Sequence, residues 1–379
     1  MKMPKSSCRT EELERLRRRY AGRGREGKTR MLDEFCEHHG YDRKHAIKLL
    51  GDQLPKPKGG VRPGAEPVYE PVREVVERIW KASEQLCGKR LEPALALWLP
   101  HYGKHYGSLL PAQKKLLGKV SAATLDRLLA PLKAEVPRRL CGTRPGTLLR
   151  TQIPIQGEVW DEQRPGFLEA DSVAHCGSSL AGDFIWSLTY TCLGSGWTEG
   201  RAVWNKGAQG VLEQTRDVEK NLPFPLLGMD FDNGSEWLNW HLVRYLQERV
   251  VPVKLTRSRP YHKDDNAHVE QKNWMWPRQV LGYARLESPA AVPLINQLYK
   301  ETWGPLQNFF LPSAKLVAKH REGSRWVRRH DRPQTAYQRL VSSGQLGRKQ
   351  AQRLRDWYYA VDPFELARQT DKQLRPILK

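Results

Sequence analysis

The sequence predicts a multidomain α/β protein, with helical modules near the N-terminal end and a mixed-sheet core after them. The first observation is a set of three strand-like segments, at 166–174, 183–192 and 197–204, followed by alternating helix and strand patterns. Such a series is typical of a mixed sheet covered by helices. The second observation is a pair of helix–turn–helix patterns upstream of this core. The third is the concentration of positive charge at both ends of the chain.

Composition indicates a globular protein with a polyanionic partner. The 379 residues suffice for two or three domains, and 39% of them are hydrophobic. The net charge is +21. Residues 1–62 hold 17 lysine and arginine residues against 9 acids, and residues 312–379 hold 16 against 6. We therefore expect two basic ends that grip DNA and a nearly neutral core between them.

The compartment follows from what the sequence lacks. None of the six cysteines forms a CxxC pair, so we expect free thiols in a reducing compartment. No stretch approaches the roughly 20 apolar residues of a membrane span. The first twenty residues have no apolar signal segment. The sequence therefore predicts a cytoplasmic protein without a membrane partner.

Five regions are expected along the chain. They are a basic helix-turn-helix region at 1–63, a second helical DNA-binding module at 64–133, a basic linker at 134–159, the core at 160–312, and a basic C-terminal region at 313–379. The linker carries Arg138, Arg139, Arg144 and Arg150, which suit contact with phosphates. Beyond residue 345 we expect two helices and assign them no function.

The first region contains a helix at 30–39, a stop at Gly40, and a second helix at 43–50 capped by Asp42. The outward positions of the second helix are expected to be Arg43, Lys44 and Lys48. We interpret this pair as a DNA-reading helix-turn-helix, with an ordinary helical hairpin as the alternative. A zinc module is disfavoured: the candidate ligands are Cys36, His38, His39 and His45, but Cys36 has no CxxC partner.

The second module combines an apolar stripe with three further helix patterns. The stripe is formed by Val72, Val75, Val76, Ile79 and Trp80. A helix at 91–99 is expected to end at Pro100, and two more are expected at 112–118 and 122–130. This pair could read DNA or could serve packing alone.

The core patterns continue with a helix at 207–221, a strand at 225–231, a helix at 235–248, a strand at 250–255 and a last helix from about Asn266. Three carboxylates stand on these elements. Asp171 lies in GFLEADSVAH, Asp232 in GMDFDNGSEW and Glu270 in SRPYHKDDNAHVEQKNW. Like charges repel unless a cation holds them, and a pair of Mg²⁺ ions suits such oxygen ligands. Glu169, Asp230 and Glu236 are the competing acids.

The order, spacing and surroundings of these acids resemble the catalytic core of DDE transposases and retroviral integrases. Asp171 matches the first acid, Asp232 the second in its Asp-Asn-Gly context, and Glu270 the third in its Asn-Ala-x-Val-Glu-x-x-Asn context. Gly282-Tyr283-x-Arg285 and the segment from Phe309 to Leu340 also resemble bacterial insertion-sequence transposases. The resemblance covers about 30–345. It implies an RNase H-like core fold.

The resemblance also implies an activity. It is metal-dependent cleavage of the element's ends, followed by transfer of the freed 3′-hydroxyl into target DNA. Asp171, Asp232 and Glu270 would bind two Mg²⁺ ions, or Mn²⁺ in their place. The residues expected to support the site are His175, Asn233 and Asn273. Those expected to contact DNA in the core are His262, Lys263 and Lys272.

The implied partners are double-stranded DNA, as terminal inverted repeats and as target, and a second copy of the chain. We expect a homodimer or higher oligomer on paired ends, in the bacterial cytoplasm at the nucleoid. Two alternatives stay open. One is a regulatory DNA-binding protein that derives from a transposase and has lost catalysis; the other is an RNase H-like nuclease without strand transfer.

Overall fold

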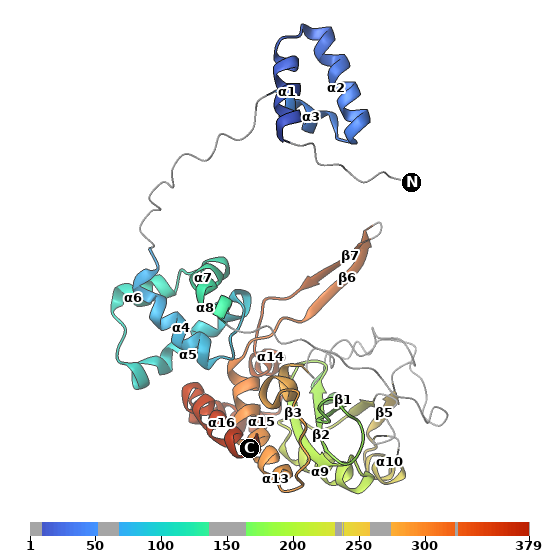
Figure 1. The fold of residues 1–379 in the computed structure, drawn as a ribbon. Coiled ribbons are helices and arrows are strands. Elements are labelled where there is room, and N and C mark those ends of the chain that lie inside the picture. Colours follow the sequence, from blue (N-terminus) through green and yellow to red (C-terminus); the bar gives the residue numbers. More distant parts are fainter. Residues whose placement is uncertain are drawn as a thin grey trace. The chain divides into compact units, whose positions relative to one another are not determined.

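The computed structural model describes residues 10–51, 68–135, 164–231, 237, 239–257, 274–322 and 325–378. It divides the chain into two compact units, Met1–Val68 and Tyr69–Lys379 (Figure 1). The predicted boundary near residue 63 lies close to this division. The predicted boundaries at 133, 160 and 312 fall within the second unit, whose parts share one hydrophobic core.

The first unit consists of α1 (Thr10–Ala21), α2 (Arg25–His39) and α3 (Arg43–Leu50). Gly40 ends α2 with a φ of 65°, a conformation that suits glycine. The Asp42 side chain accepts a hydrogen bond of 2.7 Å from the Lys44 backbone N–H and caps α3. A small core of Leu32, Phe35, Ala46 and Leu50 joins the helices. Both predicted helices are confirmed; DNA reading stays a prediction.

The second unit begins with a helical module. Its elements are a 3-10 turn (Glu70–Val72), α4 (Arg73–Ala82), α5 (Gly88–Tyr106), α6 (Pro111–Leu117), α7 (Ala122–Leu128) and α8 (Ala130–Glu135). The predicted apolar stripe is buried as expected. The predicted end at Pro100 is wrong, because α5 continues to Tyr106. Trp98 and Tyr102 are buried on one face of α5, and their packing holds the helix together across the exposed proline.

A mixed five-stranded sheet forms the centre of the second unit. Its strands are β1 (Phe167–Ala174), β2 (Ile185–Cys192), β3 (Thr198–Trp204), β4 (Gly228–Phe231) and β5 (Lys254–Arg257). Their order is β3-β2-β1-β4-β5. β1 pairs antiparallel with β2 and parallel with β4, while β2–β3 is antiparallel and β4–β5 parallel. The predicted mixed α/β sheet is confirmed, and β1 is its central strand.

Helices cover both faces of the sheet. On one face lie α9 (Ala208–Asn221) and α10 (Trp240–Gln247). There Tyr190 hydrogen-bonds Thr215 of α9 at 2.8 Å. On the other face lie three π-helical turns, Trp274–Arg278, Tyr299–Trp303 and Leu306–Phe310, together with α12 (Gln279–Leu281) and α13 (Ala291–Leu298). There Ser187 of β2 hydrogen-bonds the Tyr299 hydroxyl at 2.8 Å.

The fifth strand lies later than predicted. Val250 and Val251 are exposed, and the strand covers Lys254–Arg257 instead of 250–255. Pro252 has no N–H to donate to a neighbouring strand, so pairing begins after it. The apolar run therefore gave the right element with the wrong bounds.

Two asparagine side chains cap the outer edge of β3. The Asn308 amide donates to the Thr198 carbonyl at 2.8 Å and accepts from the Thr198 N–H at 3.0 Å. The Asn296 amide makes the same pair of bonds with Ala202, at 3.1 and 2.7 Å. Each amide thus satisfies backbone groups that a neighbouring strand would otherwise pair. The edge is closed to another chain at these two positions.

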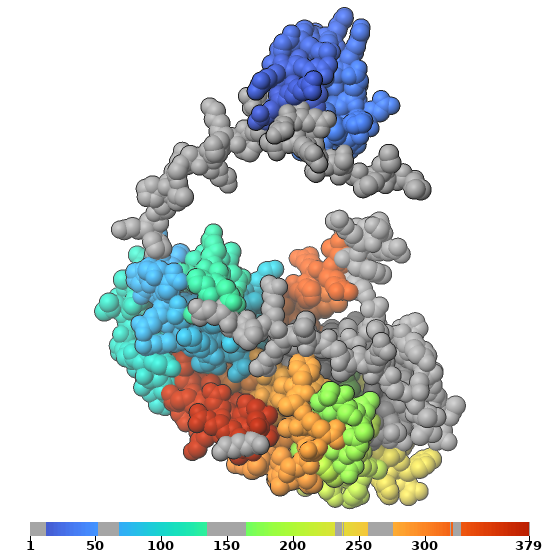
Figure 2. Space-filling view, viewed as in Figure 1, coloured from blue at the N-terminus to red at the C-terminus, as the bar shows by residue number. Residues whose placement is uncertain are grey.

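The C-terminal elements complete the same unit. They are the hairpin of β6 (Leu316–Glu322) and β7 (Arg325–His330), then α14 (Ala336–Ser342), α15 (Arg348–Ala360) and α16 (Pro363–Ile377). The two helices expected beyond residue 345 are confirmed. Figure 2 shows the red C-terminal residues lying against the light-blue residues of the helical module that begins the second unit. The Trp98 ring contacts that of Phe364 at 4.9 Å, and its indole donates to the Phe310 carbonyl at 3.1 Å.

In the parts of the chain that the structure describes, no helix is both long and apolar enough to cross a membrane.

Candidate active site

Asp171 lies on the central strand β1, near the end of its pairing with β4. The strand begins with buried Phe167 and Leu168, and Asp171 is half-buried. Its Oδ1 accepts a hydrogen bond of 2.6 Å from the Ser172 backbone N–H. Across the sheet, Asp171 pairs with Thr189 of β2, which pairs with Gly200 of β3. The carboxylate is therefore held on a rigid strand, beside small neighbours.

Two other acids share this face of the sheet. Glu169 pairs with Asp230 of β4, and alternate residues of a strand point to the same face, so both lie on the side of Asp171. Glu169 is 4% exposed. The Asp230 carboxylate accepts a hydrogen bond of 2.5 Å from Thr256 of β5. In the sequence, Glu169 and Asp230 were the alternatives to Asp171 and Asp232 as catalytic acids. The structure shows that Asp230 has a hydrogen-bond partner on the neighbouring strand.

The other two predicted acids, Asp232 and Glu270, lie outside the described residues. So do Asn233 and Asn273, and the predicted DNA contacts Arg138, Arg139, Arg144, Arg150, His262, Lys263 and Lys272. Within the ranges that the structure describes, no group of three or more histidine, cysteine, aspartate or glutamate side chains is arranged to hold a metal ion.

The chain returns from the segment containing Glu270 directly onto the sheet face of Asp171. Trp276 is fully buried against Gly200, where an added Cβ would lie only 2.8 Å from the indole ring. Arg278 donates a hydrogen bond of 2.9 Å to the Ala174 carbonyl at the end of β1. A side chain at position 200 would push this turn away. Gly200 thus allows the turn at Trp274–Arg278 to lie on the row that contains Asp171.

His175 is placed in the interior. Its Nε2 lies 2.8 Å from the Ser187 hydroxyl, which in turn hydrogen-bonds Tyr299. Burial, with a further contribution from the Arg278 charge, lowers the pKa of His175 from its usual 6.5 to about 3. The ring is therefore neutral near pH 7. It stands four residues, about 13 Å along a strand, from Asp171. A supporting role at a metal site stays a prediction.

Sequence reasoning missed Ser187, Tyr299 and Gly200. Ser187 and Gly200 lie on strands that read as ordinary buried segments, and Tyr299 is 112 positions from the serine that it contacts. Only the alternation of hydroxyl residues along β2, Ser187, Thr189 and Thr191, pointed to a polar face there.

The predicted DNA contacts of the first unit are on its surface. Arg43, Lys44 and Lys48 are all exposed on α3. Arg43 forms an ion pair with Asp33 of α2. Arg17 of α1 donates to the Leu49 carbonyl at 2.7 Å, which fixes the end of α3. The helix that carries these charges thus contacts both neighbouring helices through polar side chains.

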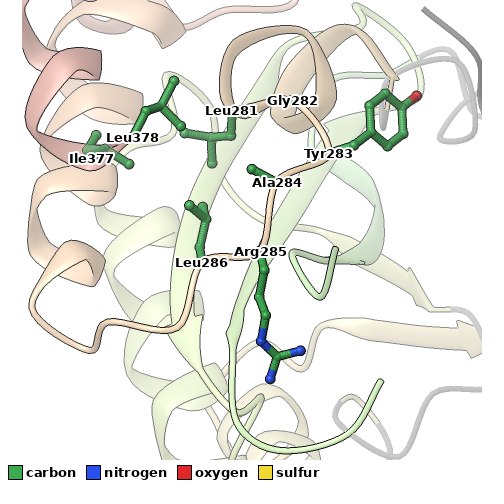
Figure 3. A pocket seen from close by; sticks show the side chains of 8 residues that line it. All are labelled: Leu281, Gly282, Tyr283, Ala284, Arg285, Leu286, Ile377 and Leu378. Carbon is green, nitrogen blue, oxygen red and sulfur yellow. The ribbon is translucent and has the colours of Figure 1, made fainter. Parts of the chain in front are cut away.

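A separate cavity of about 480 Å³ lies beyond α12 and is lined by Leu281–Leu286, Ile377 and Leu378. Figure 3 shows the Arg285 guanidinium directed away from Leu281 and the C-terminal pair. Arg285 instead donates to the carbonyls of Cys176, Ser179, Ala181 and Asp183, at 3.2, 2.9, 2.7 and 3.2 Å. The arginine of the Gly-Tyr-x-Arg motif therefore fastens the loop after β1. Among the residues that the structure describes, those lining the cavity include none of the predicted catalytic residues.

Comparison with known proteins places the chain in a family. No family model matches it. It is 38% identical over 340 residues to the uncharacterized protein y4rM of Sinorhizobium fredii, a match that covers 86% of this chain and 93% of that protein. Identity at this level across nearly the whole length of both proteins means a shared fold. The chain belongs to the same family as the uncharacterized protein y4rM of Sinorhizobium fredii.

Proposed function

We propose that the protein is a DNA transposase of the DDE type, with an RNase H-like core and a metal-dependent active site at Asp171. The observation that carries this proposal is the register of β1 and β4. Ala170 pairs with Phe231, the last described residue of β4. Asp171 follows Ala170, and Asp232 is bonded to Phe231, so its Cα is within about 3.8 Å of that of Phe231. In the sequence, therefore, each of these two acids directly follows one member of the last residue pair between β1 and β4.

The strand order supports the same core. Three antiparallel strands are followed by two parallel ones in the order β3-β2-β1-β4-β5, with the helix α9 before β4 and α10 before β5. In this order the first strand is central, and ligands of open α/β sheets bind at the carboxyl ends of the strands. Asp171 lies toward that end of β1.

The third acid fits by length. Arg278 contacts Ala174, and Glu270 precedes Arg278 by eight residues. A helix extended backward from Trp274 would rise by about 1.5 Å per residue, or about 12 Å over this stretch. Asp171 lies three residues, about 10 Å, back along β1 from Ala174. A helix antiparallel to β1 would therefore bring Glu270 level with Asp171.

The carboxylates fit the proposed metals because Mg²⁺ and Mn²⁺ prefer hard oxygen ligands. Bound there, a pair of ions would activate water or the 3′-hydroxyl and stabilise the leaving oxygen of the phosphodiester. The carboxylates of this chain would position the ions. Asp171, on the central strand, would hold the ions together with Asp232 and Glu270.

The remaining parts suit a protein that handles DNA ends. The exposed cations of α3 would recognise terminal repeats, and Lys263 and Lys272 would lie near the cleaved end. Two copies would hold paired ends, and the reaction would take place on nucleoid DNA in the bacterial cytoplasm. A regulator without catalysis would bind the same ends and leave them intact.

The test is an assay of nicking and joining on duplexes that carry the ends of the protein's own element, with Mg²⁺ present. Wild-type chain should cleave and join. Asp171→Asn, Asp232→Asn and Glu270→Gln should each abolish cleavage and keep DNA binding, because they remove only negative charge beside phosphate. Asp230→Asn is the control, since an asparagine oxygen still accepts the hydrogen bond from Thr256. Binding without any cleavage by wild type would favour the regulator, and cleavage by all three variants would refute the proposed site.

A further inference from the structure

The hairpin of β6 and β7 has a strongly basic sequence. Residues 316–330 contain five lysine and arginine residues, two histidines and a single glutamate. The described side chains of Val317, His320, Arg328 and Arg329 are exposed, and Val317 is 57% exposed. The tip at residues 323–324 is outside the described range.

Basic residues occupy opposite positions in the register of this hairpin. Lys319 stands directly opposite Arg328 in the register. Like charges at opposite positions of an antiparallel pair repel each other. Arg328 and Arg329 are consecutive, so the two point to opposite faces of the ribbon. These two exposed arginines thus place positive charge on both faces of the ribbon.

The base of the hairpin is firmly attached. Arg339 of α14 donates to the Ser313 and Gln334 carbonyls at 2.6 and 2.9 Å, and to the Asp331 carboxylate at 2.8 Å. Asp331 also accepts from the Lys315 N–H at 2.5 Å. Lys315 reaches the Gly194 carbonyl, in the turn between β2 and β3, at 3.2 Å. One arginine therefore clamps both strands where they leave the sheet-bearing unit.

We propose that the β6–β7 hairpin is a DNA-binding element that enters the major groove of duplex DNA. A two-stranded ribbon fits the width of the B-form major groove. Positive charge on both faces matches a site with a phosphate backbone on each side. The clamp at Arg339 fixes the direction of the ribbon relative to the sheet, so the hairpin sets where bound DNA passes the core. This inference rests on the proposed function for its ligand class, DNA.

The contacts would be mainly to phosphate, with Arg328 and Arg329 on opposite walls of the groove. Each phosphate contact releases condensed counterions, so the affinity becomes steeply dependent on salt. The major groove of A-form RNA is too deep and narrow to admit such a ribbon. Duplex RNA is therefore the competing ligand that separates groove entry from general attraction to polyanions.

The experiment measures binding of the full-length chain to a plain DNA duplex across a series of salt concentrations, with EDTA to prevent cleavage. The double variant Arg328→Ala/Arg329→Ala should weaken binding roughly tenfold or more at 0.1 M salt and reduce the salt slope by about 1.8. Arg328→Lys/Arg329→Lys, which keeps the charge, should retain most of the slope. The matched control is Lys349→Ala/Arg353→Ala, which removes two exposed cations from α15. An unchanged affinity and slope, or an equal loss in the control, would overturn the proposal.

Groove entry is tested with two further probes. A duplex whose cytosines carry glucosylated hydroxymethyl groups has an obstructed major groove. Wild-type chain should bind this duplex more weakly than plain DNA. The alanine double variant should show a much smaller difference in affinity between the two duplexes. For duplex RNA the same double variant should lose little affinity. If the obstructed duplex binds wild type as well as plain DNA does, or if RNA binding falls as much as DNA binding, the groove assignment is wrong.

These outcomes are separable from the proposed function. Binding in EDTA does not depend on the acids at the active site. If the wild-type chain binds DNA through the hairpin but never cleaves it, the proposed transposase activity is refuted and the DNA-binding role of the hairpin stands. If the wild-type chain cleaves DNA but the hairpin variants bind DNA normally, the DNA-binding role of the hairpin is refuted and the transposase activity stands.

Discussion

Asp171 is positioned by residues that have no charge of their own. It shares a row with Thr189 and Gly200, and Gly200 leaves room for Trp276. The sequence predicted that Asp171 lies on a strand, because the residues around it have a strand pattern; its catalytic role stays a prediction. The sequence did not predict Gly200 or the hydrogen-bonded set of His175, Ser187 and Tyr299, because these contacts join positions far apart in the chain. Only the folded sheet brings them together.

His175 gives a pH prediction. Its pKa is lowered to about 3 in the folded protein, whereas the free ring titrates near 6.5. Below pH 6.5 the imidazole of His175 binds a proton in the unfolded chain but not in the native chain. The contribution of His175 to stability is therefore complete above pH 6.5 and decreases as the pH falls toward 3. His175→Gln should flatten the change in melting temperature between pH 6.5 and 5. His241→Gln, at an exposed site on α10, is the control. An equal pH dependence in His175→Gln and wild type would contradict this account.

At the scale of elements, periodicity predicted most of the fold. Strands β1 to β3 and helix α9 lie within two residues of their predicted bounds. The errors have local causes: α5 passes through Pro100 because its buried face continues, and β5 starts after Pro252. The π-helical turns were not predictable. They carry the buried residues Trp276, Trp303 and Phe309, whose positions are set by packing on the sheet and not by helical spacing.

The capped edge of β3 yields a stability prediction. Asn308 is 2% exposed and satisfies both backbone groups of Thr198. Asn308→Ala leaves a buried donor and a buried acceptor without partners, at roughly 1–3 kcal/mol each. The free energy of unfolding, measured in urea, should therefore fall by an amount of that order. Asn221→Ala removes an exposed amide at the end of α9 and should change stability by less than about 0.5 kcal/mol. A similar small loss in both variants would show that the cap is unimportant.

At the scale of the whole molecule, the chain divides into two compact units, and the predicted boundary near residue 63 lies close to the division. The second unit joins the helical module, the sheet and the C-terminal helices through one core that includes Trp98, Phe310 and Phe364. The composition signalled the division near residue 63, because proline and glycine gather there. The composition did not predict that the C-terminal helices pack on the helical module. The basic surface residues dominate the composition of the C-terminal region, and the aromatic contacts join positions far apart in the chain.

If the protein acts on paired DNA ends as proposed, end recognition by the first unit and cleavage by the second can be assigned to different copies by mixing two defective chains. A Glu270→Gln chain should lack catalysis, and a chain with Arg43, Lys44 and Lys48 changed to alanine should lack end recognition. If the first unit of one copy binds the end that the other copy cuts, mixing the two defective chains should restore part of the cleavage. Gel shifts and sizing would confirm mixed complexes. No recovery within confirmed mixed complexes would mean that each copy cuts the end it binds.

The central claim is a metal-dependent phosphodiester site at Asp171. Its most direct test is the cleavage rate of end-bearing duplex under single-turnover conditions, with Mg²⁺, Mn²⁺, Ca²⁺ or EDTA, for wild type and Asp171→Asn. We predict cleavage by wild type with Mg²⁺ and Mn²⁺, and little with Ca²⁺, whose longer and looser coordination misplaces the reacting groups. We predict none in EDTA and none by Asp171→Asn with any metal. Cleavage that survives EDTA, or proceeds at the wild-type rate in Asp171→Asn, would contradict the account.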